Sequence, residues 1–204
     1  MKYLLLIFLQ SVCYAEFLPR SFQAEFEQQI VSAVTGKVKK TQGTLEYMFP
    51  SQLKFEIFTP DKKLSSAFYS NKSKSSLYTP PFVEGEAGNL IVQSSEKLFL
   101  SRFFDSMSHG LKNNELYDVK LDKNSLELIF KEKMQERIGI ARAIFENVAN
   151  PQKVHSLSEL KELKIILSDS KEVKLVFTNF KTGMKFTSEH FVFKAPKNTK
   201  ISEK

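Results

Sequence analysis

Residues 22–29 read FQAEFEQQ, and their polarity alternates. Phe22, Ala24 and Phe26 occupy even positions, whereas every odd position of the stretch is polar. Successive side chains of a β-strand point to opposite faces, so this alternation is typical of a half-buried strand. One face of the segment therefore meets water. The other face meets an apolar environment, which is either the protein's own core or a ligand that the protein carries.

The same alternation continues along the chain between short turns. Leu45, Tyr47 and Phe49 share one face of residues 44–49, and Leu53, Phe55 and Ile57 share one face of residues 53–58. Further strands are predicted at residues 64–70, 76–79, 116–121, 125–131, 163–167, 173–179, 184–188 and 190–194, and residues 197–204 are predicted to be a loose tail. This succession of hairpins predicts an antiparallel sheet. The chain has no Gly-, Pro- or Ser-rich linker, which predicts a single domain over residues 16–204.

Two segments depart from the alternating pattern. Residues 96–107, EKLFLSRFFDSM, place apolar side chains at helical spacing around more than half of a helix. Residues 133–150 also have a helical stripe, with Pro151 after it, although a pair of strands fits this stretch as well. An antiparallel sheet with one apolar face needs a cover, which such helices supply. The fold class is therefore mainly β (α+β), with either a solid core or a cavity under the helices that holds an acyl chain.

The N-terminus has the layout of a secretory signal peptide. Residues 1–15, MKYLLLIFLQSVCYA, contain one basic residue, an apolar run and small residues at Cys13 and Ala15. Cleavage after Ala15 removes the only cysteine of the chain. Residues 10–12 do not fit the pattern that precedes a lipidated cysteine. Export to the periplasm is therefore expected, and stability must come from burial without a disulfide.

Charge and motifs narrow the function classes. The net charge of +7 would suit nucleic acid, an anionic membrane or an acidic partner, but export argues against nucleic acid. The lysines are scattered, which favours a solvated basic surface over a docking patch. Glycine-rich phosphate loops and the common hydrolase motifs are missing, and His109, His155 and His190 are isolated in sequence. We therefore predict no enzyme, no cofactor and no metal site.

Four stretches resemble the LolA-like family of outer-membrane lipoprotein carriers. Residues 21–29, SFQAEFEQQ, resemble its first strand, and residues 43–64, GTLEYMFPSQLKFEIFTPDKKL, resemble its two strands and two prolines. Residues 69–84, YSNKSKSSLYTPPFVE, resemble the strand before a Tyr-x-Pro segment, and residues 191–201, FVFKAPKNTKI, resemble the closing Phe-x-Phe strand. The four stretches occur in the family's order over nearly the whole chain after residue 15.

The resemblance implies an incomplete, strongly curved antiparallel β-barrel with helices as a lid over its concave face. It implies a monomer that takes acylated lipoproteins from an inner-membrane ABC transporter to an outer-membrane acceptor. An envelope regulatory or scaffolding module of the same fold is the alternative. With the alternation and the helical spacing, the resemblance gives a candidate lipid-binding set: Phe22, Phe26, Leu45, Tyr47, Leu53, Phe55, Ile57, Phe68, Leu98, Phe99, Phe103 and Phe104.

The chain departs from the family pattern at the residues that control the lid. Family members often have an arginine directly before the first proline, and Phe49 stands there in this sequence. The family's Asp-Gly turn is replaced by Asn71 and Lys72. Residues 16–20 are too few for the helix that usually precedes the first strand. Our hypothesis is that the helix expected at residues 133–150 replaces the missing part of the lid.

Overall fold

A computed structural model describes residues 17–31, 36–95 and 99–203. Strands dominate this part of the chain, with two short α-helices and several 3-10 turns. The strands are β1 (Ser21–Val31), β2 (Val38–Met48), β3 (Gln52–Phe58), β4 (Leu64–Ser70), β5 (Lys74–Thr79), β6 (Gly88–Ser94), β7 (Tyr117–Leu121), β8 (Leu126–Phe130), β9 (Ile140–Glu146), β10 (Glu162–Leu167), β11 (Glu172–Thr182) and β12 (Thr199–Glu203). The helices are α1 (Phe99–Ser106) and α2 (Glu132–Ile138), and the 3-10 turns are Met107–His109, Pro151–Lys153, Leu157–Glu159 and Ser188–Phe191.

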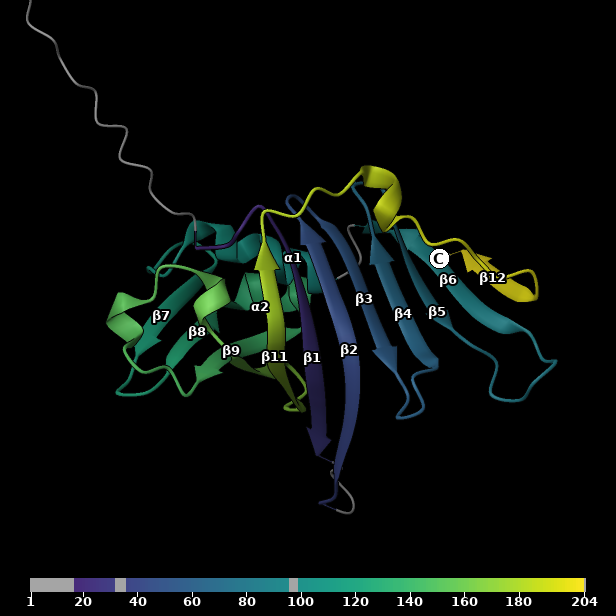
Figure 1. Ribbon diagram of the computed structural model, residues 1–204. Helices are drawn as coiled ribbons and strands as arrows, with labels where there is room; N and C mark the ends of the chain where they lie inside the picture. The colour runs from purple at the N-terminus through teal and green to yellow at the C-terminus, as the bar shows by residue number, and fades with distance from the viewer. Residues whose placement is uncertain (1–16, 32–35, 96–98, 204) are drawn as a thin grey trace, which may run out of the picture.

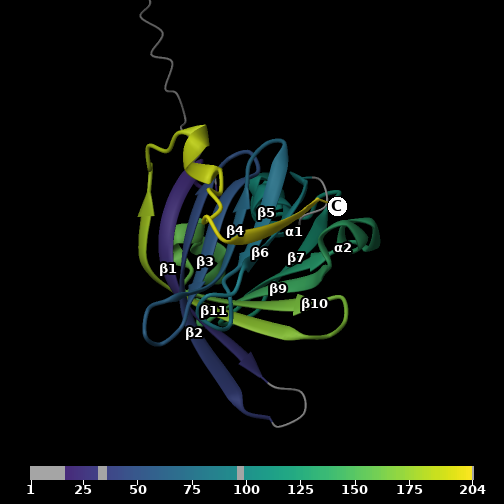
Figure 2. The same cartoon turned by 90° about the vertical axis from the view of Figure 1, so that its right-hand side faces the viewer.

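The strands form one open, curved sheet (Figures 1 and 2). Across the described residues its 12 strands lie in the order β12-β6-β5-β4-β3-β2-β1-β11-β10-β9-β8-β7. Neighbouring strands in this order are antiparallel, including β1 with β11, except that β12 runs parallel to β6. The predicted fold class, a mainly β protein with an incomplete antiparallel barrel, is confirmed with this one parallel pair as an exception.

The alternation in β1 has the predicted effect. Phe22, Ala24 and Phe26 are buried, whereas Glu25 is exposed. Phe22 pairs with Tyr47 of β2, and Ala24 pairs with Leu45. Partners that lie directly opposite each other point to the same face, so the apolar positions of β1 and β2 form a common surface. This surface is the concave side of the sheet, where the main core lies.

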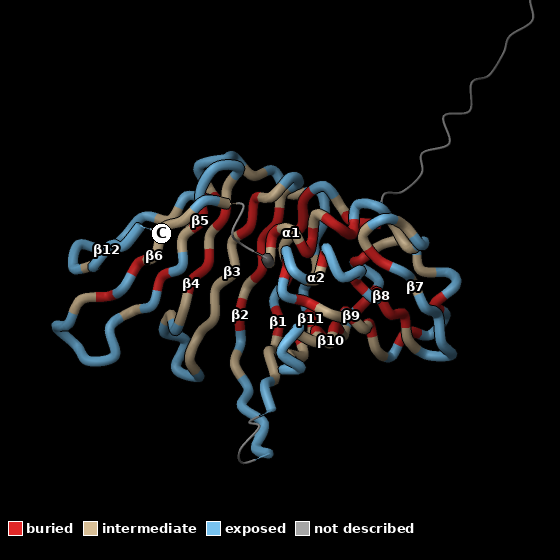
Figure 3. The backbone as a smooth tube through the Cα atoms, turned by 180° about the vertical axis from the view of Figure 1, so that it is seen from behind, coloured by how far each residue is buried: buried red, intermediate tan, exposed pale blue. Residues whose placement is uncertain are grey.

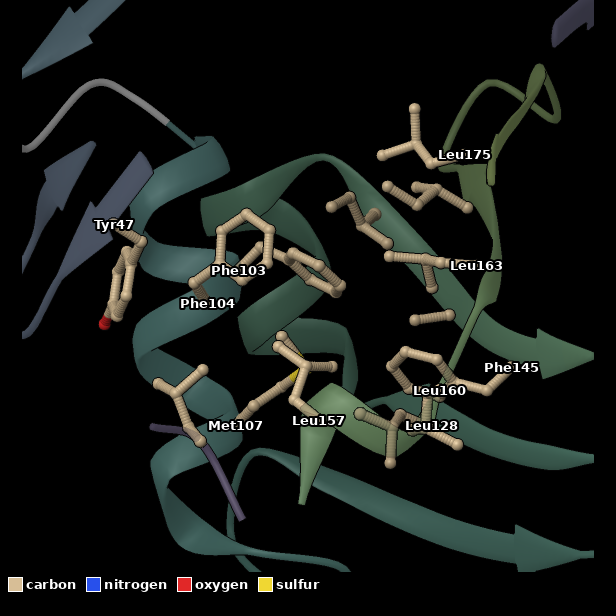
Figure 4. Close-up of a cluster of buried hydrophobic side chains, with 14 of the residues drawn as sticks. Tyr47, Phe103, Phe104, Met107, Leu128, Phe145, Leu157, Leu160, Leu163 and Leu175 are labelled. Atoms are coloured by element: carbon tan, nitrogen blue, oxygen red, sulfur yellow. The ribbon is translucent and has the colours of Figure 1, made fainter. Parts of the chain in front are cut away.

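Helix α1 lies in the hollow of the curved sheet. Phe103 and Phe104 on α1 are almost completely buried, at 0% and 1% exposure. Figure 4 shows them between Tyr47 on one side and Leu163 and Leu175 on the other. Viewed from behind, α1 and α2 lie in front of the sheet near β1, β11 and β9, and do not extend over β4, β5 and β6 (Figure 3). The helices therefore cover only part of the concave face.

A smaller core lies on the opposite face of β4, β5 and β6. Ala67, Tyr78 and Leu90 are buried there. Phe193, which follows the last 3-10 turn, packs its ring against Tyr78 at 4.8 Å between centroids, and also packs against Tyr69. The C-terminal segment thus covers the outer face of these strands.

The prediction of a helix at residues 133–150 is correct up to residue 138 and wrong after it. Helix α2 ends at Ile138, because Gly139 takes a left-handed conformation with φ of 64° and its N–H donates to the carbonyl of Gln135. Residues 140–146 then form β9 and pair with β8 and β10. The alternative of strands was thus correct for the second half. Only α2 is available as the lid replacement that we hypothesised.

Three further predictions near the C-terminus are also wrong. Residues 184–187 form no strand, and residues 188–191 form a 3-10 turn. The Nε2 atom of His190 lies 2.5 Å from the Oε2 atom of Glu46, which anchors this turn to β2. Residues 199–203 are not loose but form β12, because the edge of β6 has backbone groups to pair with. β6 itself was not predicted, and residues 1–16, including the expected signal peptide, lie outside the described residues.

Gly43 allows close packing between β1, β2 and β3. A Cβ atom at this position would collide with the ring of Phe26 and the carbonyl oxygen of Glu56. We expect Gly43→Ala to lower the unfolding free energy by about 1–3 kcal/mol, because a backbone carbonyl cannot move aside as a flexible side chain can. Urea denaturation would measure this change. Thr44→Ala, on the next residue and the opposite face, is the control, and an equal loss in both variants would contradict the steric argument.

Candidate functional site

One row of apolar side chains crosses the concave face from β1 to β6. Cross-strand pairing places each of its members directly opposite the next, so all of them point to the same side. The row consists of Ala24, Leu45, Phe55, Phe68, Leu77 and Ile91. Only every second residue of each strand can belong to this row, because successive side chains of a strand point to opposite faces.

Half of this row is covered and half is open. Ala24 and Leu45 are fully buried in the main core, whereas Leu77 is 40% exposed and Ile91 is half-buried. Neither Leu77 nor Ile91 belongs to either of the two cores. We call Phe55, Ile57, Phe68, Leu77 and Ile91 the apolar strip. It is an apolar surface on the concave side of β3 to β6, beside the helix-covered part.

The apolar strip is continuous with the core. The ring of Phe55 stacks on the ring of Phe26 at 4.6 Å between centroids. Phe55 and Ile57 are partly buried against the main core, and Phe68 is 8% exposed. A flexible apolar ligand on the strip would therefore touch side chains that already pack against the core.

A carboxylate on α1 fixes this helix to the β2–β3 turn. The Oδ1 atom of Asp105 accepts hydrogen bonds from the hydroxyl of Tyr47 at 2.5 Å and from the backbone N–H of Ser51 at 2.9 Å. The hydroxyl of Ser51 donates to the Oδ2 atom of the same carboxylate. We call Asp105, Tyr47 and Ser51 the latch. Charged acceptors make stronger hydrogen bonds than neutral ones, so the latch holds α1 firmly against the sheet.

The environment of the latch keeps Tyr47 protonated. Burial raises the pKa of Tyr47 far above its usual value, and the nearby charge of Asp105 and the hydrogen bond to it raise the pKa further. The phenol therefore remains a hydrogen-bond donor over the whole physiological pH range. Ser70 extends the anchorage to β4, because its hydroxyl donates to the carbonyl of Ser51 at 3.1 Å.

The structure places the residues of the predicted lipid-binding set in three groups. Eight of them are buried in the main core: Phe22, Phe26, Leu45, Tyr47, Leu53, Phe68, Phe103 and Phe104. Phe55 and Ile57 are half-buried beside it. Phe99 is the first residue of α1, but its side chain is not among the described ones, and Leu98 lies outside the described residues. The prediction that these residues contact lipid stays a prediction.

Sequence reasoning missed two members of the apolar strip. Leu77 lies on a strand whose other concave-face residues, Ser75 and Thr79, are polar. Ile91 lies on β6, which was not predicted as a strand. Leu77 lies opposite Phe68, and Ile91 lies opposite Leu77. Both residues can therefore be assigned to the strip only when the strand register is known.

Phe49 stands in the position where the family often has arginine. Its side chain is 44% exposed, and its backbone N–H donates to the carbonyl of Arg20 at 2.8 Å. Asp105 instead supplies the polar contact between helix and sheet, from the helix side. In this structure the polar contact between α1 and the β2–β3 turn is therefore made by Asp105 and not by the residue before Pro50.

The described residues offer no obvious centre for metal chemistry. Among them, no group of three or more His, Cys, Asp and Glu side chains could hold a metal ion. Likewise, none of the helices in the described part of the chain has the length and apolar character needed to span a bilayer.

The structure is thus an open, curved β-sheet with a helix in its hollow and an apolar strip beside that helix. Curated relatives named "Outer-membrane lipoprotein carrier protein", from Francisella tularensis subspecies tularensis and subspecies holarctica, are 25% identical to the chain over 183 residues. The match covers 89% of this chain and 80% of each relative. These relatives confirm the resemblance inferred from the sequence, although no family model matches the chain.

Solved structures of two proteins are also similar. One is a LolA superfamily protein from Nitrosomonas europaea, with a TM-score of 0.45, 12% identity, and coverage of 88% of this chain and 93% of that one. The other is a putative outer membrane lipoprotein-sorting protein domain from Vibrio parahaemolyticus, with a TM-score of 0.42, 14% identity, and coverage of 84% of this chain and 88% of that one.

Proposed function

We propose that this protein binds the acyl chains of lipoproteins and carries them through the periplasm from the inner to the outer membrane. The observation that supports this proposal best is the apolar strip, which begins at the core with Phe55 and Phe68 and continues to Leu77 and Ile91, outside both cores, on strands that α1 and α2 do not cover. The name of the curated relatives, "Outer-membrane lipoprotein carrier protein", is consistent with such cargo. Binding of this kind needs no catalytic group, so the proposed function includes no enzymatic activity.

The proposed binding begins on the apolar strip and proceeds toward the core. An acyl chain gains about 0.8 kcal/mol for each CH₂ group removed from water. Leu77 and Ile91 are accessible first, followed by Phe68 opposite Leu77 and by Phe55 opposite Phe68. To reach Phe22 and Tyr47 the chain must displace α1, because Phe104 packs on both rings. In this mechanism α1 is the lid, and the latch determines how easily it moves.

The remaining parts of the proposal concern the route of the cargo. Residues 1–15 would act as a signal peptide and be removed on export, leaving residues 16–204 as a single carrier domain. An inner-membrane ABC transporter would donate the lipoprotein, and an outer-membrane acceptor would receive it. The carrier would act as a monomer.

A second function is favoured by one observation. Eight residues of the predicted lipid-binding set are already buried in the main core, two of them on α1, so the part of the hollow beside α1 is filled in this conformation. A filled core suits an envelope regulatory or scaffolding module that binds lipid or lipoprotein without transporting it. The two functions differ in whether acyl chains displace α1.

Introducing a charge on the apolar strip tests the proposed function. The full chain would be coexpressed with a diacylated lipoprotein in a host with an outer membrane, purified from the periplasm and analysed by native mass spectrometry. We expect a one-to-one complex, and we expect Leu77→Glu to reduce acyl-probe affinity at least about tenfold, because covering a carboxylate with hydrocarbon is costly. Leu77 is 40% exposed, so the substitution should leave the fold intact.

Ser76→Glu is the matched control. It introduces the same charge on the same strand but on the opposite face, where Ser76 pairs with Tyr69 and Val92. Normal binding by this variant is expected. Equal binding by the Leu77→Glu variant would contradict the apolar strip as the acyl-binding site, and a folded protein that carries no lipid and binds no probe would exclude the carrier.

A further inference from the structure

Exposed apolar side chains gather at one end of the sheet. Because β1 to β6 pair as successive antiparallel neighbours, the β1–β2, β3–β4 and β5–β6 connections all lie at the same end, which is the lower end in Figure 1. Val31 and Val38 are 54% and 52% exposed beside the first connection. Phe82, in the third connection, is 101% exposed. Single exposed apolar residues are common on protein surfaces, but here they lie in two connections at the same end of the sheet.

The hairpin of β1 and β2 extends beyond its neighbours. β3 pairs with β2 only as far as Gln42, so Val38 and the next three residues of β2 pass the end of β3. On the other side, the last pair between β1 and β11 is Ile30 with Val173. Figures 1 and 2 show the hairpin projecting from the sheet. The pair of Val31 and Val38 is thus presented to the surroundings.

Basic residues surround this apolar tip. Lys37, Lys39 and Lys40 lie on the returning strand and the residues just before it, and all three are exposed. Lys40 forms an ion pair with Glu27 at 2.9 Å. The adjacent β3–β4 turn adds Lys62 and Lys63, of which Lys63 pairs with Asp61 at 3.5 Å. This part of the surface therefore has a positive balance.

The β5–β6 loop carries charges of both signs. Glu84 and Glu86 follow Phe82 and Val83 in the loop. The side chain of Asn198 donates to the carbonyls of Gly85 and Glu86, which brings the C-terminal segment with Lys197 next to the loop. Phe82 therefore protrudes from a loop that is fixed to its neighbour and carries no strong net charge.

We infer that this end of the sheet binds the surface of a bilayer that contains anionic lipids. The two apolar tips are separated by four strand spacings, or roughly 19 Å, and so form no common groove for a protein partner. A bilayer surface needs only tips that project in the same direction. Apolar side chains beside lysines are the combination that inserts into the interfacial region while the ammonium groups meet lipid phosphates.

Membrane contact at this end would orient the sheet so that its concave face lies near the lipid, which suits the proposed cargo. The membrane contact itself does not depend on the carrier function. Ile30 points to the same face as Phe26, because both are even positions of β1. With the tips in the bilayer, the lower end of the concave face is next to the lipid surface. Binding to vesicles that carry no lipoprotein would demonstrate the membrane contact even if the carrier function failed.

The absence of tryptophan from the chain allows a direct test. Phe82→Trp and Val38→Trp each introduce a single fluorophore at one tip, and Leu121→Trp introduces one at the opposite end, where Leu121 is 43% exposed. We expect a blue shift of emission for the first two variants, and none for the third, on adding vesicles of phosphatidylglycerol and phosphatidylethanolamine. No shift at either tip would overturn the inference.

Charge removal provides the second measurement, by vesicle co-sedimentation of the full chain. Lys39→Gln with Lys40→Gln is expected to weaken binding about 30-fold, and high salt should weaken it as well. Lys72→Gln with Lys74→Gln, at the opposite end of the sheet, makes the same charge change and should have little effect. Equal effects of the two pairs, or equal binding to phosphatidylcholine vesicles, would contradict an anionic bilayer as the partner. Failure to bind vesicles of either composition would instead favour a protein partner for these tips.

Discussion

Truncation of Phe104 to alanine is expected to lower the free energy of unfolding by about 3–5 kcal/mol. Phe104 is 1% exposed, and its ring lies 5.7 Å from the ring of Phe22 and 5.6 Å from that of Tyr47. Removing it leaves a cavity between α1 and two strands that are held in place by their own pairing. Such strands cannot collapse fully into the cavity, so most of the lost packing is not recovered.

The measurement is urea denaturation followed by circular dichroism, with Phe104→Leu as the control. Leucine keeps most of the apolar volume, and its loss should be clearly smaller. A loss below about 1 kcal/mol for Phe104→Ala would contradict the packing argument, because typical truncations of buried aromatic residues cost several times more. It would mean that α1 contributes little to the folded state and rests on the sheet as a loose cover.

The first five strands could be predicted because each one carries its own signal. In β1 and β3 the alternation is nearly strict, and Pro50 and Pro60 mark the turns before and after β3. The prediction of residues 133–150 failed because helical and strand periods both fit a short apolar run. Gly139 at the end of α2 was the local signal that could have decided between them.

The remaining features could not be predicted because they depend on the register between strands and on contacts between distant segments. The open part of the apolar strip exists because Leu77 lies opposite both Phe68 and Ile91, and pairing across strands is not written in any one segment. The latch depends on contact between Asp105 and residues more than 50 positions earlier in the chain. The pairing of β12 with β6 likewise joins segments that are far apart in sequence.

Removal of the Asp105 carboxylate is expected to release α1. In Asp105→Ala the hydroxyl of buried Tyr47 and two donors of Ser51 lose their acceptor, and we expect the unfolding free energy to fall by about 2–3 kcal/mol. Hydrogen exchange of the α1 amides should accelerate by about 30-fold or more, since about 2 kcal/mol corresponds to that factor. These changes would be measured by urea denaturation and by hydrogen exchange with mass spectrometry.

The same variant distinguishes a lid from a fixed core helix. If α1 must move to admit an acyl chain, weakening the latch lowers the free energy of opening, and an acyl probe should bind more tightly to Asp105→Ala than to the original protein. Asp105→Asn keeps an oxygen that can accept from Tyr47 and from the N–H of Ser51, so its effects should be smaller, and Tyr47→Phe should lose only one bond. Lower stability with faster exchange but unchanged probe affinity would mean that cargo binds on the apolar strip alone, without displacing α1. Slower exchange or unchanged stability would mean that the latch does not hold the helix, because the lost acceptor then had no energetic role.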